Sequence, residues 1–222
     1  MLERDSDSCP VIVISILNPK GGCGKTTIAT NLARSLHERG RQVLLVDSDP
    51  QGSARDWHAS ADNPIPLVAL DRPNNLKTLA SVGRGYDYVL IDGAAKLEGM
   101  IAALVKASDH ILIPVQPSPY DVWAVSDLVE VVKTRQEVTG GRPSAAFVIS
   151  RAFARTTLTA DVSDVLEEYG LEVCSTRIVQ RQVYPQAATG GLTVFEAKNA
   201  DAVQEVAALT EEVVAMCRRS GP

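Results

Sequence analysis

The stretch that most constrains the fold of this chain is a glycine-rich segment, Asn18-Pro19-Lys20-Gly21-Gly22-Cys23-Gly24-Lys25-Thr26-Thr27. It follows a short run of apolar residues at 11–17 and opens a segment in which apolar residues recur at helical spacing. Glycine permits the tight backbone curvature that such a connection needs. The order of these features predicts a buried strand, a tight loop and then a helix.

A loop of this kind is suited to holding phosphate groups. Its backbone N–H groups can converge on phosphate oxygens, and the helix that follows points the positive end of its dipole at the same place. We expect Lys25 to bridge the β- and γ-phosphates of a nucleotide and the Thr26 hydroxyl to bind Mg²⁺. The alternative is a glycine-rich turn with no ligand. The expected cradle consists of Lys20, Gly21, Gly22, Cys23, Gly24, Lys25, Thr26 and Thr27.

The strict phosphate-loop pattern G-x-x-x-x-G-K-[ST] is not met, because Pro19 stands where its first glycine would fall. A second lysine, Lys20, precedes the glycine pair. This arrangement resembles the deviant Walker A box of the ParA/MinD family of ATPases. In that family the extra lysine reaches across a dimer interface to the nucleotide of the other subunit, and Lys20 matches its position. The resemblance implies catalytic roles for Lys20 and Lys25, with ATP and Mg²⁺ as cofactors and a homodimer in the ATP state.

Two aspartates follow the run at residues 42–46, which is apolar from Val43 onward. In open α/β sheets, ligands bind at the carboxyl ends of the strands, so these acids are expected to face the phosphate loop. The segment Asp47-Ser48-Asp49-Pro50-Gln51 resembles the D-x-D-P-Q box of the same family. By that resemblance Asp49 orients the attacking water, and Asp47 lies near the metal and the loop lysines. The alternative is that both acids cap the helix predicted at residues 51–60.

A third acid ends the run Tyr86-Asp87-Tyr88-Val89-Leu90-Ile91-Asp92. Four apolar residues followed by aspartate form the Walker B pattern, whose carboxylate holds Mg²⁺ directly or through water. The pattern is weak alone, but here a phosphate loop precedes it. We therefore predict that Asp92 is associated with the metal, together with Thr26 and Asp47.

The rest of the chain continues the alternation of strands and helices. Further strands are expected at residues 110–115, 144–150 and 173–179, and further helices at 96–107, from the turn at 116–121 to about 139, at 158–169 and at 199–217. Such alternation predicts an α/β fold, a doubly wound and mostly parallel sheet with helices on both faces. We expect a disordered lead-in at residues 1–10 and a single domain at 11–222.

The C-terminal part adds a second resemblance. The segments Gln180-Arg181-Gln182-Val183-Tyr184 and Thr189-Gly190-Gly191-Leu192-Thr193-Val194-Phe195-Glu196 resemble the signature of the small plasmid-partition subgroup typified by ParF, whose loop closes over the base. By this resemblance Arg151 and Gln182 lie beside adenine. For Arg151 the alternative is an ordinary surface arginine.

Charge and cysteine content exclude several classes of protein. A formal net charge of −5 argues against attraction of the whole molecule to DNA, so any contact with DNA requires a local basic patch. No cysteine lies between Cys23 and Cys174, which removes the iron-sulfur members of this fold. The expected terminal helix is too acidic to bind membranes, and residues 1–7 do not read as a signal peptide. The candidates for a DNA patch are Arg151, Arg155, Arg177, Arg181, Lys198, Arg218 and Arg219.

The resemblance thus implies a cytoplasmic, nucleoid-associated ATPase that makes no membrane contact. Proteins of this type dimerise on ATP, bind DNA without sequence preference and are switched off when a ParB-like or other adaptor stimulates their slow hydrolysis. We expect the cargo to be a plasmid or chromosome. The alternatives are a protein cargo such as a carboxysome and, further away, a metabolic ATP-dependent ligase of related fold.

Overall fold

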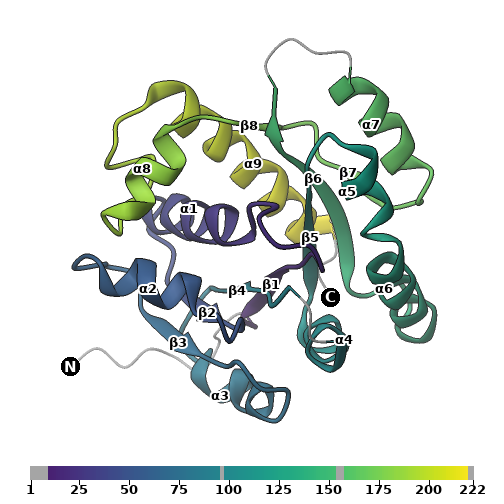
Figure 1. The fold of residues 1–222 in the computed structure, drawn as a ribbon. Helices are drawn as coiled ribbons and strands as arrows, with labels where there is room; N and C mark the ends of the chain where they lie inside the picture. The colour runs from purple at the N-terminus through teal and green to yellow at the C-terminus, as the bar shows by residue number, and fades with distance from the viewer. Residues whose placement is uncertain (1–9, 96–97, 154–157, 220–222) are drawn as a thin grey trace.

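A parallel β-sheet forms the centre of the molecule (Figure 1). The computed structural model describes residues 10–95, 98–153 and 158–219. Most of the lead-in predicted at 1–10 falls outside them. Within the described residues the strands are β1 (Ile12–Ile16), β2 (Val43–Asp47), β3 (Leu67–Ala69), β4 (Tyr88–Asp92), β5 (His110–Val115), β6 (Ser144–Ala152), β7 (Glu172–Val173) and β8 (Ile178–Val179).

The strand order is that of a doubly wound sheet. The strands are arranged β3-β2-β4-β1-β5-β6-β7, with β8 beside β6, and the recorded pairings are parallel. The helices are α1 (Lys25–Glu38), α2 (Ser53–Ala59), the 3₁₀ turn η1 (Asn75–Thr78), α3 (Leu79–Val82), α4 (Glu98–Ala107), α5 (Pro119–Trp123), α6 (Ser126–Thr139), α7 (Leu158–Glu167), α8 (Val183–Thr189) and α9 (Ala200–Arg219). The predicted fold class is confirmed.

Two hydrophobic cores lie on the two faces of the sheet. Successive side chains of a strand point to opposite faces, so Val13 packs into one core and Ile14 into the other. The helices α1, α2, α8 and α9 cover one face, and α3 to α7 cover the other (Figure 1). Burial on both faces explains why the strands read as continuous apolar runs in the sequence.

The structure differs from the predicted elements in three places. The helix expected to run to residue 139 is broken into α5 and α6 around Ala124 and Val125. The strand expected at 173–179 is divided into β7 and β8, because the side chain of Glu212 binds the backbone N–H groups of Ser175 and Thr176. The segment expected to close over a base as a loop contains a helix, α8.

The register of the sheet brings the acidic strand ends together. Asp92, at the end of β4, lies opposite Ile16 of β1 on one side and opposite Asp47 of β2 on the other. The chain leaves β1 into the glycine-rich loop, which therefore begins beside these two carboxylates.

Candidate nucleotide site

The glycine-rich loop is held in place by the ends of β5 and β6. Asn18 donates a hydrogen bond to the carbonyl of Pro114 (2.6 Å), and Ser150 donates one to the carbonyl of Cys23 (2.6 Å). Gly24, the last residue before α1, has a φ of 96°, a conformation that side chains rarely adopt. The loop is thus a fixed turn at the N-terminus of a 14-residue helix, as an anion site requires.

Lys25 carries a charge with no acidic partner in the described part of the chain. Its Nζ donates to the carbonyl oxygens of Asn18 (3.0 Å) and Lys20 (2.9 Å), and the residue is only 7% exposed. Carbonyl dipoles stabilise an ammonium group without neutralising it. A buried cation in this state favours an anion such as a phosphate in the loop.

Lys20 is engaged within its own chain. Its Nζ lies 2.8 Å from Oδ2 of Asp121, a residue of α5 that is 4% exposed. Oδ1 of Asp121 is also buried, and it has no hydrogen-bond partner among the residues described. The lysine side chain itself remains 40% exposed, so the contact closes one side of the loop without burying the ammonium group.

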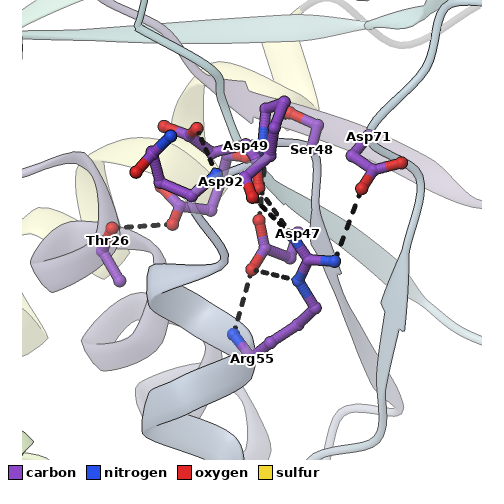
Figure 2. Close-up of polar contacts among 9 residues, drawn as sticks. Thr26, Asp47, Ser48, Asp49, Arg55, Asp71 and Asp92 are labelled. Carbon is purple, nitrogen blue, oxygen red and sulfur yellow. Dashed lines mark hydrogen bonds and ion pairs between the residues drawn. The ribbon is translucent and has the colours of Figure 1, made fainter.

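Asp92 and Thr26 place a carboxylate and a hydroxyl, two oxygen groups that Mg²⁺ can use as ligands, next to each other. The Thr26 hydroxyl donates to Oδ2 of Asp92 (2.7 Å), whereas the buried Oδ1 of Asp92 has no partner in the described structure (Figure 2). Burial raises the pKa of Asp92 to about 7. A hydroxyl and one carboxylate fit Mg²⁺, which takes few protein ligands when it is bound with phosphates. Within the same residues, no closed cluster of three or more His, Cys, Asp or Glu side chains is present.

Asp47 and Asp49 differ in what they contact (Figure 2). Asp47 is fully buried, and its two oxygens accept hydrogen bonds from the backbone N–H groups of Asp49 and Arg55 (both 3.0 Å). The Arg55 guanidinium adds an ion pair at 3.3 Å. Asp47 therefore supports the segment that leads into α2, much as the capping alternative proposed, and its role as a metal ligand remains a prediction without a supporting contact.

Asp49 lies instead on the rim of a cavity of about 740 Å³ that opens over the loop. Its Oδ1 accepts the N–H of Gln51 (3.0 Å), and Oδ2 has no recorded contact in the described part. Other predicted residues of the site also line this cavity. They are Gly21, Gly22, Gly24, Lys25, Thr26, Thr27 and Arg151.

A second cavity, of about 290 Å³, adjoins the first, since both are lined by Gly24, Thr27 and Arg151. Arg151 has a φ of 51°, which is strained for a residue with a side chain and is often found at functional sites. Gln182 is exposed and lines neither cavity, so its place beside the base stays a prediction without a supporting contact. The wall is formed instead by Gln180, Arg181, Tyr184 and Pro185.

The sequence of residues 14–194 matches the family described as the CobQ/CobB/MinD/ParA nucleotide-binding domain. The chain belongs to this family. Its expected ParA/MinD character is thereby confirmed, whereas membership of the ParF subgroup stays a prediction.

Proteins of this family resemble the chain over most of its length. The chain is 34% identical to the "Maintenance of carboxysome distribution protein A" of Halothiobacillus neapolitanus over 208 residues, which cover 90% of this chain and 95% of the relative. Among solved structures, a Cyanothece McdA variant in complex with ATP superposes with a TM-score of 0.73 at 21% identity, covering 93% of this chain and 97% of the other. MinD of Pyrococcus horikoshii with Mg-ADP gives a TM-score of 0.70 at 20% identity, with coverages of 95% and 98%.

The arginines and lysine expected to form a DNA patch are not equally available. Arg181 pairs with Glu205 at 2.6 Å and with Asp201 at 3.3 Å. Arg219 pairs with Glu172, Arg151 lines the cavities, and position 155 lies outside the described residues. The exposed members that remain are Arg177, Lys198 and Arg218. None of the helices described is long and apolar enough to cross a membrane.

Proposed function

We propose that this protein is a slow ATPase that dimerises on ATP and positions a carboxysome. The observation that carries the ATPase proposal is the contact between Thr26 and Asp92. Among the described residues, it places an unpartnered carboxylate oxygen and a hydroxyl beside a buried lysine that has no acidic partner there, at the N-terminus of α1. This combination provides for a cation and for phosphate oxygens at once.

The residues then divide the work. Lys25 and the loop N–H groups hold the phosphates, and Thr26 and Asp92 would hold Mg²⁺, which neutralises phosphate charge when it is bound. Asp49 lies on the cavity rim with one oxygen engaged by Gln51, a position from which it can orient a water molecule. Asp47 holds Asp49 in place, because its Oδ1 accepts a hydrogen bond from the backbone N–H of Asp49.

Dimerisation would use Lys20. We propose that the lysine leaves Asp121 and pairs with the γ-phosphate held by a second copy of the chain, so that ATP supports the dimer and ADP does not. Arg177, Lys198 and Arg218 of two subunits would then act together on DNA, because affinity rises steeply with the number of phosphates neutralised. An adaptor that stimulates hydrolysis would end this state.

The likeness to the carboxysome distribution protein supports the choice of cargo, because it extends over nearly the whole of both chains. The plasmid or chromosome that the sequence favoured is therefore replaced by the alternative. If the gene is deleted in its host, carboxysomes should cluster while plasmids are retained normally. Plasmid loss with evenly spaced carboxysomes would return the protein to DNA partition.

The ATPase proposal is tested with Asp49→Asn. This variant should bind ATP as the wild type does and hydrolyse it at least roughly tenfold more slowly, because general base or water-positioning groups contribute factors of this size or more. Phosphate release is measured with Mg²⁺ and DNA. Asp127→Asn, an exposed acid on α6, is the matched control. Normal turnover by the Asp49 variant would assign the water to another group.

The dimer proposal is tested with Lys20→Ala. ATP-dependent dimerisation, measured by light scattering, should be lost while ATP binding by the monomer persists. DNA binding should disappear with it, and in the wild type it should require ATP and weaken with salt. A Lys20→Ala protein that still dimerises with ATP would reject the role of this lysine across the interface.

A further inference from the structure

The smaller cavity beside the loop has a wall that is held from behind. Three of the residues that line it, Val179, Arg181 and Tyr184, lie in the stretch that runs from the end of β8 into the first turn of α8. Each of them donates a hydrogen bond to the same carboxylate, that of Glu205 on α9. Glu205 itself does not line the cavity.

The contacts of Glu205 use both of its oxygens. Oε1 accepts from Nε (3.1 Å) and Nη2 (2.6 Å) of Arg181, and Oε2 accepts from the backbone N–H of Val179 (3.2 Å) and the hydroxyl of Tyr184 (3.4 Å). The two guanidinium contacts are charge-assisted, and both converge on the one oxygen Oε1. The Glu205 side chain is 16% exposed, so water competes little for these donors.

The phosphate loop is held by other groups. Its anchors include the contacts of Asn18 with Pro114, of Ser150 with Cys23, of Gln116 with Gly22 and of Lys20 with Asp121, and none of these involves Glu205. The wall and the loop are therefore fixed independently, although both border the same cavity.

We infer that Glu205 is a positioning residue that sets the affinity for the nucleoside part of ATP by holding Arg181 and Tyr184 in the cavity wall, without contacting the nucleotide. The inference rests on the proposed ATP function and extends it to α9. In the sequence, the acidic residues of this helix look like an ordinary solvent-exposed face. When an amide replaces the carboxylate, a single oxygen is left to accept from the four donors, its NH2 group faces the others, and the wall relaxes. Burial and the neighbouring Glu205 raise the pKa of Tyr184, so its hydroxyl stays a donor at neutral pH.

The inference predicts a loss that depends on the base. Glu205→Gln should weaken the binding of Mg-ATP roughly tenfold, the scale set by charged hydrogen bonds, and leave that of Mg-tripolyphosphate within about twofold. Tyr184→Phe, which removes one donor, should show the same split to a smaller extent. Both dissociation constants are measured by calorimetry. In steady-state assays KM for ATP should rise while kcat is kept, because the groups that act on the γ-phosphate are unchanged.

The matched control is Glu211→Gln on the same helix, whose partner is Arg39 and whose side chain is 71% exposed. It should bind both ligands as the wild type does. Equal weakening of ATP and tripolyphosphate by Glu205→Gln, or no weakening of ATP, would overturn the inference. If Glu205→Gln does not fold, as judged by its melting curve, the split in Tyr184→Phe decides. A wild type that binds no ATP would instead overturn the proposed function, and this inference with it.

Discussion

The phosphate end of the site and the wall of the smaller cavity treat buried charge differently. At the phosphate end, Oδ1 of Asp92 and Oδ1 of Asp121 are buried without partners in the described structure, and Lys25 contacts carbonyl oxygens. Behind the wall, Glu205 of α9 uses both oxygens to bind Val179, Arg181 and Tyr184. Further along α9, Glu212 likewise uses both oxygens to bind Ser175 and Thr176. Buried polar atoms are normally satisfied, so the first region is completed by a ligand and the second by the protein itself.

Lys25→Ala is the test of this difference for which we expect the largest change in ligand binding. If the loop is built for phosphate, removal of its central cation should weaken binding of both Mg-ATP and Mg-tripolyphosphate by roughly a hundredfold or more, as expected for charge-assisted contacts in a buried site. Calorimetry measures both ligands, with Lys106→Ala on the exposed side of α4 as the control. Retained affinity would show that the loop does not depend on its lysine.

The free energy of unfolding should show how much a buried carboxylate oxygen without a partner destabilises the protein at Asp92. Burial raises its pKa from 3.8 to about 7, so the native state binds this proton more tightly than the unfolded chain does. In metal-free protein its contribution to stability therefore falls as pH rises from about 4 to 7. Asp92→Asn should gain stability over the wild type between pH 4 and pH 8, by about 4 kcal/mol for a shift of this size.

Urea denaturation in the presence of a chelator, at the two pH values, measures this difference. The gap between Asp92→Asn and the wild type should widen with pH. A constant gap would mean that Asp92 is better satisfied than its contacts indicate.

Glu212 should behave in the opposite way and with a smaller effect. Burial alone would raise its pKa, but hydrogen bonds from Thr176 and Ser175 outweigh burial and lower the pKa below 4.5. The stability that the carboxylate contributes is therefore present above about pH 4.5 and is lost as pH falls through its lower native pKa. Glu212→Gln should cost about 1 kcal/mol at pH 7 and less at pH 3.

The same urea titrations check this prediction. The control is Glu211→Gln, because Glu211 pairs with Arg39 and not with Ser175 or Thr176. If the loss grows toward acid pH, the hydrogen bonds to Ser175 and Thr176 do not hold the segment between β7 and β8.

Much of the phosphate end could be predicted from the sequence, but the contacts that hold the cavity wall could not. The glycines before Lys25 and the apolar runs that end in Asp47 and Asp92 are local patterns, and each follows from the chemistry of phosphate binding or of buried strands. The partners that complete the site depend on tertiary structure. Lys20 and Asp121 are 101 residues apart in the chain, and no spacing rule joins them.

The residue that holds the wall was missed for the same reason, although the resemblance did point to the segment 180–184. Glu205 appears in the sequence as one more acid on an amphipathic helix, and only the packing of α9 shows that it faces Arg181. The strand predicted at 173–179 failed because apolar spacing does not register that Glu212 takes the backbone donors of Ser175 and Thr176. Gln182 was placed by resemblance alone, and the residue two positions earlier lines the cavity.

In the dimer that we propose, Lys20 would exchange one anionic partner, Asp121, for another, the γ-phosphate of a second copy. A second copy that captures this lysine must leave behind a carboxylate that is shielded from water and has no other donor in the described structure. The ATP concentration needed for dimerisation would therefore depend on α5, because the Asp121 carboxylate and the γ-phosphate compete for the same lysine. The affinity for ATP alone would not set it.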